Sequence, residues 1–256
     1  MDFSPTPAEA RLVEALREND ELRQTLREIE SSVAEARAQT EDMERLIYAL
    51  SHDFRTPLRT MSSYAQLLQR QYASDADANE MTTFIVSGAN DMKVLIEDVL
   101  KYSRIKTSPD RTTINLQSVV QWAAANLQQR VAETGARISC GDLPEVAVNE
   151  SQFVQLFEQL FRNSLTYGGA DPPVIEVSSE EQADAYLISV RDNGSGIARE
   201  YQESVFTPFK RLHGKERPGT GMGLTICRKI VRAHGGRIWV ESDGQHGSDF
   251  RFTVPF

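Results

Sequence analysis

The residue with the most reactive surroundings in this sequence is His52. It lies in the segment 46–59 (Leu-Ile-Tyr-Ala-Leu-Ser-His-Asp-Phe-Arg-Thr-Pro-Leu-Arg), whose apolar spacing predicts an amphipathic helix. Asp53 stands beside it and Thr56 follows one helical turn later. A lone surface histidine is usually just solvated. With these neighbours, however, the layout suits a histidine that accepts a phosphoryl group and releases it again, and Pro57 predicts a bend just below it.

Composition narrows the class of protein. The chain has 256 residues, 40% hydrophobic and 25% charged, which predicts a soluble protein of one or two packed domains with a helical extension. A net charge of −9 argues against general nucleic-acid binding. Two cysteines that match no metal spacing favour a reduced, cytoplasmic protein. We expect no membrane segment in this chain, because no apolar run is long enough and no signal peptide is evident.

The N-terminal residues 1–44 predict a coiled-coil helix. Apolar side chains recur at the a and d positions of about six heptads between Leu12 and Phe54, and Asn19 occupies an a position, which favours a parallel pair. The same register turns His52 away from the seam, to position f. Residues 45–106 then predict two helices joined by a turn at 73–79, so a homodimer would form a four-helix bundle.

After a linker at 107–112, residues 113–256 alternate helical and extended patterns. This order predicts an α+β sandwich with its helices on one face of a sheet. The expected helices are 116–131, 150–167 and 221–234, and the expected strands are 136–140, 146–148, 174–178, 185–191, 237–241 and 249–254.

Two polar clusters in this second part suit a nucleotide. Gln159 and Asn163 lie one helical turn apart, so their amide oxygens could face Mg²⁺, which prefers oxygen ligands. Asp192 ends a strand and precedes Gly194 and Gly196; its carboxylate could accept a hydrogen bond from the adenine amine while the glycines let the base approach. An isolated pattern of this kind is equally consistent with a tight turn.

A third and a fourth cluster follow. Lys210 and Arg211 stand beside aromatic residues, and the polar, basic span between Pro208 and Gly219 is expected to form a mobile lid over a nucleotide. A glycine-rich turn then opens a helix, where free backbone N–H groups can bind phosphate. The residues concerned are Gly219, Gly221, Gly223 and Leu224.

These four clusters, placed after the His-Asp-x-x-Thr-Pro helix, resemble the sensor histidine kinases of two-component signalling from about residue 45 to the C-terminus. The resemblance implies a dimerisation and phosphoacceptor region, followed by a Bergerat-type ATP-binding domain like that of gyrase, mismatch-repair and heat-shock chaperone ATPases. Segments 209–213 (Phe-Lys-Arg-Leu-His) and 234–242 (His-Gly-Gly-Arg-Ile-Trp-Val-Glu-Ser) are most similar to the phytochrome-type branch.

The resemblance also implies roles for single residues. His52 is similar to the phosphoacceptor, Asp53 to the neighbour that assists proton removal, and Thr56 to the residue that supports dephosphorylation of a partner. Asn163, with Gln159, resembles the magnesium site, and Tyr167, Asp192, Lys210, Arg211, Leu224 and the glycines of both loops resemble the ATP site.

Two positions depart from the family pattern. The family often has asparagine where Gln159 stands and lysine where Thr166 stands. The missing lysine would leave the phosphates more dependent on Lys210, Arg211 or Lys215.

The sequence therefore predicts an enzyme that uses ATP and Mg²⁺ to phosphorylate His52 and passes the group to an aspartate of a response-regulator receiver domain. Two alternatives stay open at this point: a protein that acts mainly as a phosphatase of its regulator, and a non-catalytic dimeric scaffold that ATP switches between conformations.

Overall fold

The computed structural model describes residues 7–106, 109–169, 171–212 and 219–256. By its contacts the chain divides into two compact units, residues 1–50 and residues 51–256. Helix α1 (Pro7–Gln71) runs across this division. The domain boundaries expected from the sequence stay predictions. No helix within the described ranges is both long enough and apolar enough to cross a lipid bilayer.

In the first unit, helix α1 leaves its apolar heptad positions in solvent. Leu22, Leu26, Ile29 and Val33 are all exposed, as are Met43 and Leu50 farther along. A long single helix with such a stripe buries too little apolar surface to be stable alone in water. The pattern is therefore typical of a helix that pairs with another through this seam.

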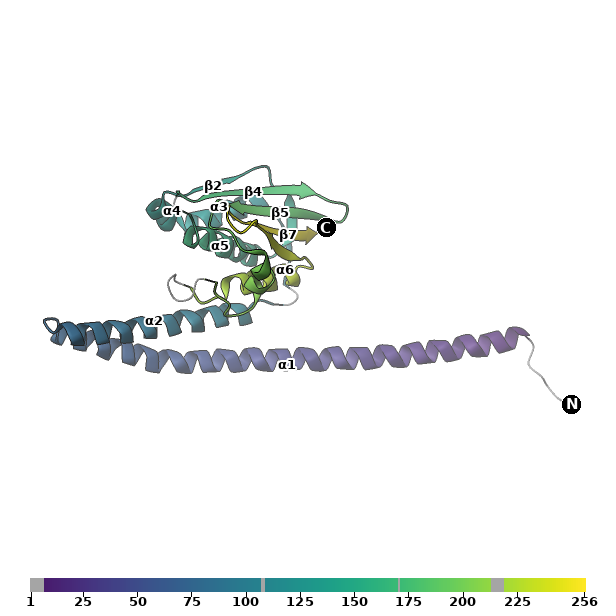
Figure 1. The fold of residues 1–256 in the computed structure, drawn as a ribbon. Coiled ribbons are helices and arrows are strands. Elements are labelled where there is room, and N and C mark those ends of the chain that lie inside the picture. The colour runs from purple at the N-terminus through teal and green to yellow at the C-terminus, as the bar shows by residue number, and fades with distance from the viewer. Residues whose placement is uncertain (1–6, 107–108, 170, 213–218) are drawn as a thin grey trace. The chain divides into compact units, whose positions relative to one another are not determined.

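In the second unit, α1 and helix α2 (Ala76–Ser103) form a hairpin (Figure 1). The helical assignment of α1 continues through Pro57 without a break. The turn spans only residues 72–75, shorter than expected, because Asp75 caps α2: its side chain accepts hydrogen bonds from the backbone N–H groups of Asp77 and Ala78, both at 3.1 Å. Gln69 bonds Thr83 across the hairpin at 3.0 Å.

The rest of this unit is built on a five-stranded sheet of order β2-β4-β5-β7-β6. Its strands are β2 (Arg137–Cys140), β4 (Val174–Glu181), β5 (Ala185–Asp192), β7 (Asp249–Pro255) and β6 (Ile238–Glu241). Only β2 and β4 pair in parallel. A separate antiparallel pair joins β1 (Thr112–Asn115) to β3 (Glu145–Val148). Strand β1 is a correction, since the sequence pattern placed the start of this segment in a linker.

Helices cover one face of the sheet, as predicted (Figure 1). They are α3 (Leu116–Asn126), α4 (Gln128–Thr134), α5 (Glu150–Thr166) and α6 (Gly223–Ala233), with short 3-10 turns at Arg199–Tyr201 and Ser204–Phe206. The expected single helix 116–131 is in fact two, because Leu127 leaves helical geometry and turns into the core. The α+β sandwich is confirmed.

Aromatic side chains of α5 fill the layer between helices and sheet. Phe153, Phe157 and Phe161 are fully buried, and the rings of Phe153 and Phe157 meet Phe252 of β7 edge-on, with centroids 6.3 and 5.9 Å apart. Edge-to-face pairs of this kind add to the stabilisation from burial alone. They fix α5, and with it the polar face that α5 turns away from the sheet.

His234 is a buried polar group that links α6 to the start of α5. Its Nε2 accepts a hydrogen bond from the Asn149 backbone N–H at 3.0 Å, so Nδ1 carries the proton and donates to the Ile230 carbonyl at 2.8 Å. The ring of Phe153 packs against it at 4.9 Å. Burial lowers the pKa of His234 below its ordinary value, and the hydrogen bond to Ile230 only partly offsets this.

We expect the free energy of unfolding to fall as pH drops through the mid-6 range. The unfolded chain protonates this histidine near its ordinary pKa of about 6.5, whereas the folded chain resists protonation, so the unfolded state binds more protons below that pH. Urea unfolding at pH 7.5 and pH 5.5 measures the effect. His234→Gln should lower stability at pH 7.5 but flatten the pH dependence; an unchanged slope would contradict this account.

Candidate functional site

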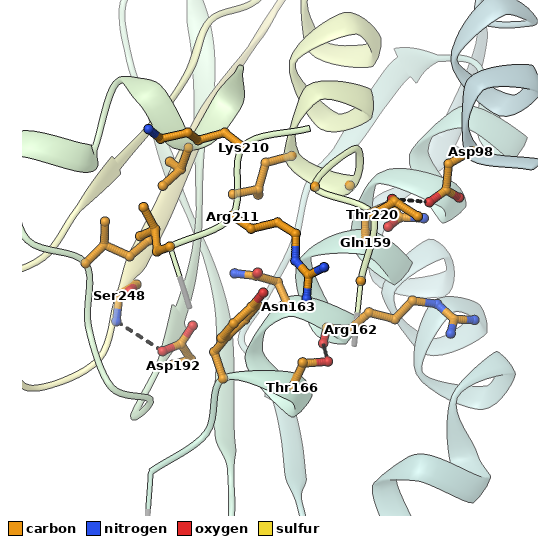
Figure 2. A pocket seen from close by; sticks show the side chains of 18 of the residues that line it. Asp98, Gln159, Arg162, Asn163, Thr166, Asp192, Lys210, Arg211, Thr220 and Ser248 are labelled. Atoms are coloured by element: carbon orange, nitrogen blue, oxygen red, sulfur yellow. Dashed lines mark hydrogen bonds between the residues drawn. The ribbon is translucent and has the colours of Figure 1, made fainter. Parts of the chain in front are cut away.

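A cavity of about 410 Å³ opens between α2, α4, α5, the end of β5 and the glycine-rich segment before α6. Figure 2 shows its walls. Of the predicted nucleotide and metal residues, all but Gly194 line it: Gln159, Asn163, Tyr167, Asp192, Gly196, Lys210, Arg211, Gly219, Gly221, Gly223 and Leu224. These residues are up to 65 positions apart in sequence, and the fold brings them to one place.

Asp192 is the buried carboxylate of the cavity, with only 8% of its surface exposed. Its Oδ1 accepts a hydrogen bond from the Ser248 backbone N–H at 3.1 Å (Figure 2) and another from the Gly194 backbone N–H at 2.9 Å. Its Oδ2 accepts one from the Ser164 hydroxyl at 2.9 Å. Burial raises its pKa above the ordinary value despite these bonds. A carboxylate has about four acceptor positions, so one is left for a donor on a ligand.

Two glycines allow the loops around Asp192 to meet. Gly247 has a φ of 78°, and a Cβ there would lie 2.0 Å from the Asp192 carbonyl oxygen. Gly194 is buried, and a Cβ on it would lie 2.7 Å from the Tyr167 carbonyl oxygen. Gly194 therefore does not line the cavity, but it lets the residues that do line it pack closely. Gly196 lines the cavity itself. Side chains at either position would force the loops apart.

Helix α5 presents one polar strip to the cavity. Gln159, Arg162, Asn163 and Thr166 are spaced at i, i+3, i+4 and i+7, and all four line it. The amide oxygens of Gln159 and Asn163 lie one turn apart. Within the described ranges, no group of three or more histidine, cysteine or acidic residues could hold a metal ion. The amide pair instead fits a magnesium ion held largely by phosphate and water.

Five cationic side chains line the same cavity. The sequence pointed to Lys210 and Arg211, and both are there; Lys215 lies outside the described residues. The structure adds Lys101 of α2, Arg130 of α4 and Arg162 of α5. Sequence reasoning missed these three because they belong to no glycine or strand-end pattern. For Arg162, its spacing of three from Gln159 was an available signal.

The glycine-rich segment forms the remaining wall. Helix α6 begins at Gly223 and not at the predicted residue 221, because Gly221 adopts a left-handed φ of 76° that a helix cannot continue. Thr220 accepts a hydrogen bond from the Met222 backbone N–H at 3.2 Å and donates its own hydroxyl to the Asp98 carboxylate (Figure 2). This bond ties the segment to α2.

His52 lies on α1 with its side chain exposed, and so do Asp53 and Thr56. The His52 Nδ1 and an Asp53 carboxylate oxygen are 3.3 Å apart. None of these three residues lines the cavity. The structure thus holds two sites, an exposed histidine with its carboxylate and a cavity suited to a nucleotide.

Comparison with known proteins gives two family matches. Residues 42–108 match the model described as "His Kinase A (phospho-acceptor) domain", and residues 148–256 match "Histidine kinase-, DNA gyrase B-, and HSP90-like ATPase". His52 falls in the first match. All the cavity residues that the sequence predicted fall in the second match.

Two individual relatives are similar to this chain over nearly its whole length. The chain is 42% identical over 244 residues to cyanobacterial phytochrome A of Nostoc sp., covering 94% of this chain and 31% of that protein. It is 40% identical to the phytochrome-like protein Cph1 of Synechocystis sp., covering 94% and 32%. The chain therefore spans about a third of the length of these relatives.

Solved structures show the same fold. Full-length ShkA in complex with AMPPNP superposes with a TM-score of 0.63 at 23% identity, over 83% of this chain and 46% of that one. The catalytic domain of histidine kinase ThkA superposes with a TM-score of 0.50 at 26% identity, over 57% of this chain and 98% of that domain. Together the two family matches show that the chain belongs to the histidine kinases, and the relatives above are of the phytochrome type.

Proposed function

We propose that the protein uses ATP to phosphorylate His52 and then passes the phosphoryl group to an aspartate of a response regulator. The observation that carries this proposal is the pairing, in one chain, of an exposed histidine bonded to a carboxylate with a cavity that has one open carboxylate acceptor and five cations. Each half supplies what the other lacks, a nucleophile or a bound phosphoryl donor.

The hydrogen bond between His52 and Asp53 selects the attacking nitrogen. An ionised carboxylate can only accept, so Nδ1 carries the proton and Nε2 keeps its lone pair toward solvent. In the proposed step Nε2 forms a bond to the γ-phosphorus as the bond to the β-phosphate oxygen breaks, and ADP leaves. Asp53 takes the Nδ1 proton, which prevents positive charge from building up on the ring. The side chains need little else, since positioning and charge neutralisation dominate phosphoryl transfer.

The cavity orients ATP by its two ends. The open acceptor position of Asp192 suits the exocyclic amine of adenine, and the cations suit the phosphates. Gln159 and Asn163 would hold Mg²⁺, which supplies charge neutralisation on the phosphate oxygens when bound. Asp192 also discriminates between purines, because a guanine places a carbonyl oxygen where adenine has its amine, and two acceptors repel.

The proposed reaction involves a second copy of this chain and a response regulator. Because His52 does not line the cavity, the ATP-binding part has to approach the histidine of its own chain or of a second copy. The exposed apolar stripe on α1, together with exposed Met81, Phe84 and Ile85 on α2, supports a homodimer through the coiled coil and a four-helix bundle. ThkA has been solved in complex with the response regulator TrrA, which supports a receiver domain as the second partner.

A second activity, dephosphorylation of the regulator, is favoured by Thr56. Its side chain is exposed one helical turn after His52, on the surface that a receiver domain has to contact during transfer. From there its hydroxyl could place a water molecule for attack on the phosphoaspartate. Exposed Arg55 and Arg59 flank it and suit an acidic partner.

His52→Gln should abolish labelling of the protein by γ-labelled ATP and Mg²⁺, because no other side chain would accept the group. In the wild type the label should be acid-labile and base-stable. His246→Gln is a matched control, since His246 is also exposed and paired with an aspartate, Asp243, at 2.9 Å. Label that persists in His52→Gln would refute the assignment, and no label in the wild type would refute autophosphorylation.

Asp192→Asn should weaken ATP binding by about 10- to 100-fold, the usual effect of losing a hydrogen bond to a charged group. The amide keeps the shape but replaces one acceptor by a donor that faces other donors. Isothermal titration with ATP and with GTP measures this, and the preference for ATP over GTP should shrink. Asp184→Asn, an exposed carboxylate outside the cavity, is the control. ATP binding equal to wild type in Asp192→Asn would exclude the proposed adenine contact.

Thr56→Ala should slow dephosphorylation of the phosphorylated regulator by at least tenfold, by analogy with other single polar contacts to a reacting water. Labelling of His52 should stay at the wild-type level, because the Thr56 hydroxyl takes no part in the proposed transfer from ATP to the histidine. The rate of label loss from a purified phosphoregulator gives the measurement. The phosphatase proposal fails if that rate does not change.

A further inference from the structure

We propose that Arg130 binds the phosphate chain of ATP and supplies the positive charge at the wall of the cavity where Thr166 stands. This inference rests on the proposed function, since it assigns a residue to the binding of the same substrate. Arg130 lies on the short helix α4, far in sequence from the glycine loops and from α5. It lines the same cavity as Asn163 and Thr166, and it is hydrogen-bonded to Thr166.

The orientation of Arg130 is set by Thr166. The guanidinium Nη2 donates a hydrogen bond to the Thr166 hydroxyl oxygen at 3.3 Å. That hydroxyl donates its own proton to the Arg162 carbonyl at 2.7 Å, so it meets Arg130 as an acceptor. Arginine has five N–H donors in a planar fork. One bond to Thr166 therefore holds the fork at the cavity wall and leaves donors for a ligand.

The charge of Arg130 has no carboxylate to balance it among the described residues. The ion pairs found there involve other groups, and the cavity cation Lys101, for comparison, lies 3.4 Å from Asp98. Arg130 is half-buried, so its charge is partly removed from water. A half-buried cation without an anion is stabilised when an anionic ligand arrives. Phosphate fits best, because its oxygens match the arginine fork two at a time.

The position of Arg130 along the cavity agrees with the place proposed for the phosphates of ATP. Ser164 bonds Asp192 and marks the side of α5 where adenine is proposed to sit. Thr166 is about 200° around the helix from Ser164, on the strip that carries Gln159 and Arg162. Figure 2 shows Asp192 and Arg162 at opposite sides of this view, with Asn163 between them. Through Thr166, Arg130 contacts the polar strip of α5 and not the side of α5 that carries Ser164.

Arg130 also differs from the cations that the sequence singled out. Lys210 and Arg211 belong to an irregular segment, whereas Arg130 is carried by a helix that packs on α5. A cation on the scaffold keeps its place whether or not the neighbouring segment moves. We therefore assign Arg130 to the binding of nucleotide before and after transfer, when ATP and ADP are bound.

The test is a titration series with ATP, ADP and adenosine, with Mg²⁺, for the full chain and for Arg130→Gln. Glutamine keeps a donor for Thr166 and much of the stem but removes the charge. We expect ATP binding to weaken about 10- to 100-fold, as for a lost hydrogen bond to a charged group, and adenosine binding to stay within about twofold. Arg137→Gln removes the same charge from an exposed site on β2 outside the cavity and should bind all three ligands like wild type.

The outcomes separate the two proposals. If wild type binds ATP and Arg130→Gln binds it equally well, the role of Arg130 is refuted while the proposed function stands. If ATP and adenosine weaken together, Arg130 is a structural residue and the inference fails. If the wild-type chain binds no ATP, both fail. Should Arg130→Gln not fold, as judged by its thermal unfolding, Arg130→Met takes its place, because methionine keeps an unbranched apolar stem and removes the charge. A loss of affinity for ATP but not adenosine again supports the inference, and equal loss for both refutes it.

Discussion

The hydrogen bonds to the Asp192 carboxylate hold the nucleotide cavity together. Its three donors come from α5, from the turn after β5 and from the residue before β7, so a single buried group fastens three segments. An ionised carboxylate in such a place is costly unless donors surround it. Burial raises its pKa, and the three bonds keep it from rising further. The arrangement that offsets this cost also leaves one acceptor position open to the cavity, so the structural role of Asp192 and its proposed role in recognising adenine belong to the same carboxylate.

The rest of the site follows from how α5 is held. Its phenylalanines lock one side into the core, which fixes the rotation of the helix and turns the strip from Gln159 to Thr166 toward the cavity. A helix free to rotate would lose the spacing between the amides and the cations. The exposed site on α1 has the opposite character. His52 and Asp53 are positioned by one helix and by each other, with solvent around them. This suits a group that, in the proposed reaction, meets a nucleotide domain and then a receiver domain.

Most of the fold and the residues that line the cavity could be predicted from the sequence, because the relevant signals are local. Periods of 3.6 and 2 located the long elements, and glycines at strand and helix ends marked the loops around the cavity. The errors came where a local pattern competes with a non-local one. Strand β1 is only four residues long and exists because β3 pairs with it. The helix at 116–131 breaks because the core takes in Leu127. Arg130 was missed for the same reason, as its bond to Thr166 crosses 36 positions that no motif connects.

The charge distribution explains how an acidic chain can attract an acidic substrate. The net charge of the protein is −9, yet the described cavity has five cationic side chains and only two carboxylates, Asp98 and Asp192. Asp98 is engaged by Thr220 and Lys101, and Asp192 by its three donors, so neither presents a free charge to the phosphates. A concave site with one sign of charge and low-dielectric walls concentrates the field within a Debye length, about 8 Å at physiological salt. Local placement of charge, and not the total, therefore decides what this protein can bind.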